Sequence, residues 1–254
     1  MSAEANARTV WIGLPAYNEE ATIPALFPRF KDVFADSPAN YRIVLYNDGC
    51  TDRTVERAHE WQGRLNVEII GKPVNHGLGE GLRCLIEHVA THGAAPDVMF
   101  IMDCDDTHHP RQFAPMLAAL DHGADVVIAS RYRAGASTAG VAPHRQFLSL
   151  GAATLFKLLH WCHGVRDYTC GFRGYRVALL QQARARYGAR LIEERGFACM
   201  VELLLKLNRI GAKMAEIPLE LRYDLKQSAS KMDVGGNTTR LLRKLVTWRV
   251  RGFK

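Results

Sequence analysis

The chain has 254 residues, of which 23% are charged and 48% apolar, as is ordinary for a soluble globular protein. Its six cysteines are scattered and form no CxxC pair, which argues against a disulfide framework and against a structural zinc site. The net charge of +7 is concentrated at the end of the chain, because residues 240–254 include six basic residues and no acidic ones.

Neither a secretory leader nor a membrane-spanning helix is expected from the sequence. The chain does not open with a charged stretch followed by an apolar one, and no apolar run reaches the roughly 18 to 20 residues that cross a bilayer. The longest near-candidate, residues 147–165, is interrupted by Lys157 and two histidines. We therefore expect a cytoplasmic protein.

The first half of the chain alternates short β-rich runs with longer helical patterns. Strands are expected at residues 10–14, 42–46, 67–71, 98–102 and 126–130, and helices at 21–35, 52–62, 78–92 and 112–122. Most of these strands are continuous apolar runs, as in sheets that are covered on both faces. The pattern predicts a three-layer, Rossmann-like α/β fold with a mostly parallel central sheet.

The second half does not repeat this pattern. A helix is expected at 147–163, then a polar stretch at 167–176, a helix at 197–210, a strand-like run at 213–222 and a closing helix. This half should therefore complete the same domain. We expect one domain over residues 1–232, followed by a basic tail at 233–254.

Polar and acidic side chains gather where the expected strands end. They are Pro15–Glu19, Asn47–Gly49, Lys72, Asp103–Asp105 and Ser130–Tyr132. Ligands of open α/β sheets bind beyond the carboxyl ends of the strands. These segments are therefore the expected binding site.

The segment Asp103-Cys104-Asp105 is the first candidate for chemistry. Residues two apart in an extended segment point the same way, so its two carboxylates can converge on one hard cation, Mg²⁺ or Mn²⁺. A solvated turn or a helix start is an equally compatible interpretation. A phosphatase of the haloacid dehalogenase type, with Asp103 as nucleophile, is a further alternative, because Asp103-x-Asp105-x-Thr107 resembles the start of that family. Against it, the motif follows the fourth strand, and no later Gly-Asp-x-x-x-Asp set is present.

Six segments, in order along nearly the whole chain, carry a resemblance to one family. They are Leu14–Glu20, Asn47–Asp52, Asn75–Gly79, Asp103–Asp105, Asp167–Arg173, and Arg222 through Lys231. Together they resemble glycosyltransferase family 2, and the last two resemble its polyprenyl-phosphate mannosyl- or glucosyltransferase branch. The resemblance implies a GT-A fold and an inverting enzyme. Such an enzyme moves a hexose from a nucleoside-diphosphate sugar, of the GDP-mannose or UDP-glucose type, to a polyprenyl phosphate.

The resemblance also implies roles on the donor side. Nucleotide-sugar binding is implied for Pro15, Tyr17, Asn18, Glu19, Asp48, Gly77, Gly79 and Asp103. Asp103 and Asp105 would hold the Mg²⁺ or Mn²⁺ that bridges the donor's phosphates, with Asp105 as a catalytic residue. Residues 8–132 would then form the nucleotide-sugar-binding half and residues 133–232 the acceptor side. The chain departs from the family pattern at Asn47, Cys50, Cys170 and Thr107, so the nucleotide and the sugar stay undetermined.

A phosphate acceptor is already anionic, so it needs cations to position it rather than a carboxylate base. The resemblance places Arg131, Arg145, Arg222, Ser230 and Lys231 around that phosphate, with Arg131 and Arg222 as catalytic residues. Glu202, among apolar residues of a helix, would either pair with an arginine of the cleft or act as a base toward a hydroxyl. Transfer to a hydroxyl of a small molecule or glycan is therefore the alternative within the family.

The basic tail predicts an amphipathic closing helix. Wound as a helix, residues 240–251 place six apolar side chains on one broad arc, with Arg249 among them and four basic side chains opposite. This pattern suits either peripheral contact with an anionic membrane or docking on the domain. The first would place the protein at the inner face of the membrane and would suit a lipid acceptor. Nucleic acid is not an expected partner, because the body has no basic groove with interleaved aromatics.

Overall fold

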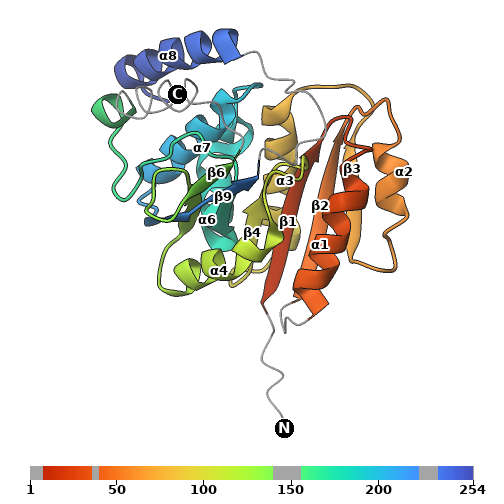
Figure 1. Cartoon of the computed structure of the whole chain (residues 1–254). Helices are drawn as coiled ribbons and strands as arrows, with labels where there is room; N and C mark the ends of the chain where they lie inside the picture. Colours follow the sequence, from red (N-terminus) through yellow and green to blue (C-terminus); the bar gives the residue numbers. More distant parts are fainter. Residues whose placement is uncertain (1–7, 36–39, 140–155, 223–233, 254) are drawn as a thin grey trace.

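The computed structural model describes residues 8–35, 40–139, 156–222 and 234–253 (Figure 1). Its main feature is a seven-stranded sheet in the order β3-β2-β1-β4-β7-β5-β8. The strands are β1 (Thr9–Ala16), β2 (Asn40–Asp48), β3 (Val67–Lys72), β4 (Val98–Ile101), β5 (Val126–Ser130), β7 (Arg173–Arg176) and β8 (Met214–Pro218). All pairings are parallel except those of β7 with β4 and β5.

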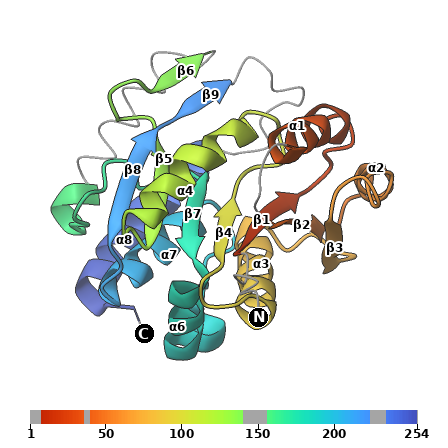
Figure 2. The ribbon, with the colours of Figure 1, turned by 90° about the horizontal axis from the view of Figure 1, so that it is seen from below.

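Helices cover both faces of the sheet, as Figure 2 shows when the molecule is seen from below. One face carries α1 (Ile23–Ala35), α2 (Thr54–His59) and α4 (Phe113–Asp121), and the other carries α3 (Leu78–His92), α6 (Val177–Tyr187) and α7 (Ala198–Arg209). The predicted three-layer α/β fold with a mostly parallel sheet is confirmed. The core therefore lies in two apolar layers, one on either side of the sheet.

The first half of the chain folds as its apolar periodicity predicts. In α3, the buried side chains Leu82, Leu85, Ile86 and Val89 follow the spacing of one helical face. The five predicted strands are all present, with β1 and β2 longer than expected because their ends continue into the polar segments of the site. The helix predicted at 52–62 is shorter, ending at His59.

The second half differs from the prediction in one element of the sheet. The polar stretch at 167–176 ends in β7, which inserts antiparallel between β4 and β5. A four-residue strand with Arg at both ends has no apolar pattern, and only the tertiary fold buries Arg173, whose guanidinium donates to the backbone oxygens of Met200 and Tyr168. Of the helix expected at 147–163, the structure describes a helical segment only at 156–159.

Two elements lie beyond the main sheet. A short parallel pair joins β6 (Ser137–Ala139) to β9 (Glu220–Arg222), and α8 (Val234–Arg251) closes the chain. Short 3₁₀ turns, η1 (Pro110–Gln112) and η2 (Gly188–Leu191), precede α4 and follow α6. No helix in the described ranges is both long enough and apolar enough to cross a bilayer.

Candidate functional site

The candidate site lies at the carboxyl ends of β1 and β4. The chain proceeds outward from β1 through β2 to β3 on one side, and β4 pairs with β1 on the other side. The order of the strands therefore reverses between β1 and β4, and such a switch point leaves a crevice where ligands bind. The segments that begin at Tyr17 and at Asp103 leave these two strands and border that crevice.

The segments after β1 and β2 are tied together by hydrogen bonds. The Asn18 side chain accepts from the backbone N–H of Thr51 at 2.8 Å and donates to its hydroxyl at 3.2 Å. The backbone N–H of Glu19 donates to the Thr54 hydroxyl at 2.7 Å. Asn18 has a left-handed backbone, with a φ of 55°, which is tolerated best by Asn among the non-glycine residues. These bonds fix Asn18 and Glu19 beyond the carboxyl end of β1, and Tyr17 beside them is 38% exposed.

Asp48 holds the glycine-containing segment at the start of α3. Its two carboxylate oxygens accept from the backbone N–H groups of His76 and Gly77, at 2.8 and 3.0 Å, and its side chain is buried. The neighbouring Asn47 uses its side-chain oxygen for the N–H of Cys50, at 2.8 Å, which explains how Asn serves where the resembled family has Asp. Asp48 therefore positions the segment that a nucleotide would meet.

Gly79 packs against a second backbone segment at the same helix start. Its N–H donates to the carbonyl oxygen of Arg195 at 2.8 Å, and a Cβ on Gly79 would lie 1.7 Å from the carbonyl oxygen of Glu194. Gly77 precedes it with a φ of 91°, a conformation that favours glycine. The two glycines are thus required for close backbone approach, and residues 194–195 form a support that sequence reasoning missed.

The sequence suggested an arginine of the cleft as one partner for Glu202, but the structure pairs Glu202 with a lysine. In the buried interior it accepts from Lys206 Nζ at 2.6 Å, and its other oxygen accepts from the backbone N–H groups of Glu193 and Glu194, both at 2.9 Å. Its exposed fraction is 1%. The carboxylate therefore orders the segment behind Gly79 and is withdrawn from the acceptor side.

The Asp103–Asp105 segment bends after β4 instead of staying extended. Cys104 points into the core, and burial raises the pKa of its thiol well above the usual range, while Asp103 and Asp105 are half-buried. Asp105 Oδ1 accepts from the Thr107 hydroxyl at 2.6 Å. Thr107, one of the residues that depart from the pattern of the resembled family, therefore orients the Asp105 carboxylate. Among the described residues no group of three or more His, Cys, Asp or Glu side chains gathers to hold a metal. A cation here would take its other ligands from substrate and water.

The sequence reading missed Asp106, which is buried behind the candidate metal residues. Its φ is 61°, and its Oδ2 meets Arg29 Nη2 of α1 at 2.9 Å. Burial raises the pKa of Asp106, and the nearby Asp105 adds to that rise, while Arg29 opposes it. The ion pair anchors the bend at Asp105 to helix α1.

Arg131 is largely committed to another side chain. Its Nε and Nη2 form a two-pronged ion pair with Asp167, at 2.8 and 2.7 Å, and Nη2 also donates to the Thr169 hydroxyl at 2.6 Å. Burial alone would raise the pKa of Asp167, but the hydrogen bonds and charge of Arg131 hold it below its usual range. The Arg131 side chain keeps 28% exposure, so a ligand can still reach part of it.

Of the other four residues predicted to bind the acceptor, the structure describes one, Arg222. The backbone N–H of Arg222 donates to the Thr107 carbonyl oxygen at 3.0 Å, which brings this exposed arginine two residues from Asp105. Arg145, Ser230 and Lys231 lie outside the described residues. The structure thus brings Arg222 to the candidate metal segment, and the acceptor roles stay predictions.

The segment 167–172 links the two sides of the site. Asp167 engages Arg131 after β5, whereas a Cβ on Gly171 would lie 3.6 Å from Asp103 Oδ1 after β4. The backbone N–H of Asp167 donates to Glu216 of β8 at 2.7 Å, which holds the start of this segment. The sequence matched this segment to a family motif, but it could not indicate these partners.

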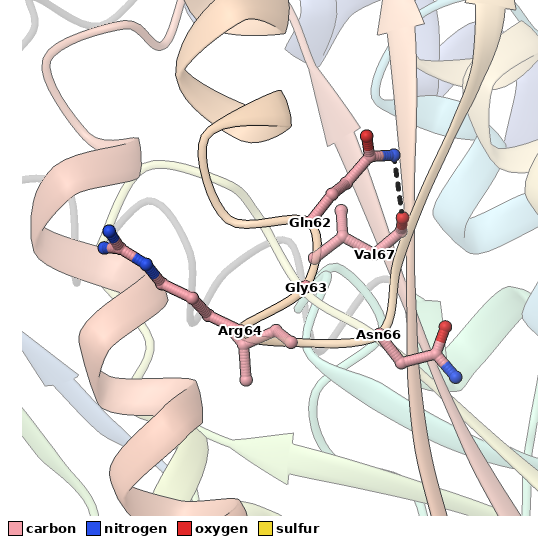
Figure 3. A pocket seen from close by; sticks show the side chains of 6 residues that line it. Gln62, Gly63, Arg64, Asn66 and Val67 are labelled. Atoms are coloured by element: carbon pink, nitrogen blue, oxygen red, sulfur yellow. Dashed lines mark hydrogen bonds between the residues drawn. The ribbon is translucent and has the colours of Figure 1, made fainter.

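A separate surface hollow lies far from these residues. It is lined by Gln62, Gly63, Arg64, Leu65, Asn66 and Val67 (Figure 3). Val67 begins β3, so the hollow is at the amino end of a strand, and Gln62 spans it with a hydrogen bond to the Val67 carbonyl oxygen at 3.1 Å. None of the candidate site residues borders it.

Comparisons with known proteins agree on one family. The model of glycosyl transferase family 2 matches residues 11–184. The dolichol-phosphate mannosyltransferase of Pyrococcus furiosus is 28% identical over 207 residues, 81% of this chain and 54% of that protein. The polyprenol monophosphomannose synthase of Mycolicibacterium smegmatis is 26% identical, over 94% of this chain and 86% of that protein. The chain thus spans about half the length of the first relative and most of the second.

Solved structures of other proteins share the fold of this chain. Glucosyl-3-phosphoglycerate synthase from Mycobacterium tuberculosis, crystallised with Mn²⁺ and UDP-glucose, superposes with a TM-score of 0.66 at 22% identity. The match covers 97% of this chain and 80% of that protein. At this identity the likeness concerns the fold, and it agrees with the sheet order and the layers described above.

Proposed function

Because the chain belongs to glycosyl transferase family 2, we propose that it is an inverting enzyme that moves a hexose from a nucleoside-diphosphate sugar to a polyprenyl phosphate. The two curated relatives are named for transfer of mannose to dolichol phosphate and for synthesis of polyprenol monophosphomannose. The observation that carries the proposal is the switch point between β1 and β4. There Asp48, which holds the glycine segment, ends β2, and Asp103 and Asp105 follow β4; β2 and β4 are the two neighbours of β1 in the sheet.

Donor binding is proposed for the half formed by residues 8–132. Pro15, Tyr17, Asn18 and Glu19 would line the nucleoside, and the ring of Tyr17, which is 38% exposed, would stack on the base. Gly77 and Gly79 bring backbone close to the phosphates at the start of α3, where the helix dipole favours negative charge. Asp48 acts through this segment by fixing its N–H groups.

A divalent cation, Mg²⁺ or Mn²⁺, fits the two half-buried carboxylates of Asp103 and Asp105. Two protein carboxylates leave several positions for phosphate oxygens and waters, which suits these hard cations. Gly171 has no side chain to fill the space next to Asp103. When bound, the cation would stabilise the nucleoside diphosphate as it leaves. The chain's own contribution is to orient Asp105 through the Thr107 hydroxyl and to anchor the bend through Asp106 and Arg29.

A phosphate acceptor is favoured over a hydroxyl because two buried carboxylates among the described residues of the 133–232 half are already engaged. Glu202 is bound by Lys206 and two backbone N–H groups, and Asp167 is bound by Arg131. A hydroxyl would need a free base, whereas a phosphate needs cations. We propose that Arg222 and the partly exposed Arg131 bind it, together with Arg145, Ser230 and Lys231 of the 133–232 half. Transfer to a hydroxyl is the alternative within the family.

A lipid acceptor also requires access to a membrane. We propose that the tail at 233–254 makes peripheral contact with anionic lipid at the inner face of the membrane. The basic residues of 240–254, without acidic ones among them, support this contact. The domain itself would remain on the cytoplasmic side.

Two measurements test the proposed function. First, thermal shifts with GDP and UDP, with and without Mn²⁺, should show metal-dependent stabilisation that Asp105→Asn removes. Second, transfer from radiolabelled GDP-mannose or UDP-glucose to a short polyprenyl phosphate should fall at least about a hundredfold in Arg222→Ala. Arg57→Ala, which alters an exposed arginine of α2, is the matched control and should leave transfer unchanged. The proposal is wrong if neither nucleotide stabilises the protein under any metal condition.

A further inference from the structure

Large apolar side chains are exposed on two elements that meet at one end of the molecule. On α8 these are Leu242, Val246 and Val250, with exposed fractions of 37, 54 and 77%. In the helical segment 156–159 and just after it they are Leu158 and Trp161, at 76 and 68%. Large side chains this exposed are unusual in a cluster and mark an interaction surface.

The closing helix α8 uses a different face to dock on the domain. Leu245 and Trp248 are buried, and Trp248 packs on the Phe253 ring at 5.2 Å between centroids. Lys244 forms an ion pair with Glu194 of the segment behind Gly79. The apolar arc expected from the sequence is therefore divided into a docked part and an exposed stripe at positions i, i+4 and i+8.

The two exposed sets belong to one surface. His160 Nε2 lies 2.9 Å from the Leu245 carbonyl oxygen, so the chain at 156–161 adjoins the middle of α8. The amide of Asn208 in α7 donates to the Trp161 carbonyl oxygen at 3.4 Å, which fixes the backbone of that exposed tryptophan. Figures 1 and 2 both show the green segment beside α8, at the end of the molecule toward which β1 runs.

The charges around the stripe are basic. At 100° per residue, Arg243 and Arg249 fall at the two borders of the stripe formed by Leu242, Val246 and Val250, and both arginines are exposed. The described part of α8 contains no acidic residue. A stripe of apolar side chains between cations is complementary to a layer of anionic headgroups above acyl chains.

We propose that Leu158, Trp161 and the exposed stripe of α8 form a two-element surface that inserts into an anionic membrane, with Trp161 as its interfacial anchor. This extends the tail contact proposed above to a second, separate segment of the domain. Tryptophan is favoured at the boundary between headgroups and acyl chains. A second copy of the chain is a poorer occupant, because its own copies of Arg243 and Arg249 would be brought close to these.

The test uses the full chain and sedimentation with vesicles of phosphatidylcholine, alone or mixed with phosphatidylglycerol. We expect binding only to the mixed vesicles, weakened by salt. Leu158→Ser with Trp161→Ser should lower the partition coefficient about tenfold or more. Arg249→Ser should lower it about fivefold, the factor that corresponds to about 1 kcal/mol for one basic residue. Arg64→Ser, in the hollow at the amino end of β3, is the matched control and should change nothing.

Fluorescence provides a readout of insertion itself. Trp161 is the most exposed of the four tryptophans, so vesicles should shift the emission of the wild-type protein to the blue and should not shift that of Trp161→Phe, which should still bind. Vesicle binding that survives Leu158→Ser with Trp161→Ser overturns the proposal. So does a concentration-dependent dimer that these substitutions abolish in light scattering, because the surface would then bind a second copy. Transfer to a short, water-soluble polyprenyl phosphate should stay unchanged, which separates this proposal from the catalytic one.

Discussion

Replacing Asp48 by Asn tests how the glycine segment before α3 is held. The carboxylate of Asp48 accepts two backbone N–H groups, from His76 at 2.8 Å and from Gly77 at 3.0 Å. An Asn side chain has a single acceptor oxygen, and its NH₂ group would face the second N–H, donor against donor. One hydrogen bond to a charged acceptor is thus lost, and one backbone donor is left without a partner.

The magnitude follows from these two bonds. A hydrogen bond to a charged group contributes about 1.5–3 kcal/mol, so Asp48→Asn should lower the free energy of unfolding by about 2 kcal/mol. For a chain of this size, that corresponds to a fall in Tm of about 4–8 °C. Because the segment must then be ordered by the ligand, the Kd for GDP or UDP should rise by about tenfold.

The assays are urea unfolding and calorimetric titration with the nucleoside diphosphate that the thermal-shift screen selects. Asn47→Asp is the matched control at the adjacent residue. It keeps the oxygen that accepts from the Cys50 N–H, so both quantities should stay close to those of the wild type. If Asp48→Asn unfolds at the wild-type urea concentration, its carboxylate does not hold the segment. If only affinity falls, Asp48 contacts the nucleotide directly.

Three further substitutions test the support around the site. Gly79→Ala should lower the free energy of unfolding by about 1–3 kcal/mol in urea, because its Cβ would lie 1.7 Å from the Glu194 carbonyl oxygen. Gly123→Ala is the control: no atom lies within 4 Å of the added Cβ, so only backbone strain should lower its stability. Glu202→Gln should cost about 3 kcal/mol of stability, because the buried Lys206 would lose its nearer counter-charge and keep only Glu193, at 3.3 Å. The pH profile of transfer by the folded fraction should stay unchanged, and a profile shifted in pH would instead indicate a catalytic base. Asp167→Asn should also cost about 3 kcal/mol at neutral pH. The folded pKa of Asp167 is lowered, so its contribution is present above about pH 4 and is lost as the pH falls through the folded value. Acid unfolding should therefore be shallower in the variant, and identical acid transitions would refute the linkage.

The sheet was predictable where the chain folds locally. Strands that are buried on both faces contain a continuous apolar run, so β1, β2 and β4 follow from the pattern of apolar residues. β7 could not be predicted, because its sequence carries two arginines and its burial depends on carbonyl groups of α7 and of residue 168. Polar strands of this kind are stabilised by tertiary contacts that leave no periodic signal.

The sequence predicted which residues lie at the candidate site, but it did not predict their hydrogen-bond partners. The carboxyl ends of the strands identified Asp48, Asp103 and Arg131 as residues to examine. Their hydrogen-bond partners lie 28 to 38 residues away for Asp48 and Arg131, a separation at which sequence carries no geometric information. The hydrogen bonds of Asp48 to the backbone could not be read from the sequence, and Glu202 is bound to Lys206 and not to an arginine.

The antiparallel direction of β7 has a kinetic consequence. Because β7 runs opposite to its neighbours, its first residue, Arg173, lies level with Ile101 at the carboxyl end of β4 and with Ile128 in the middle of β5. The preceding residues therefore enter the crevice as one short span, with Asp103 near one end and Arg131 at the other. A donor bound next to Asp103 would contact residues 167–172 and fix their conformation. Because Arg131 binds Asp167 at the other end of this segment, the acceptor side would then be ordered before the acceptor binds. We expect compulsory-order kinetics, donor first, visible as acceptor affinity that depends on bound nucleoside diphosphate.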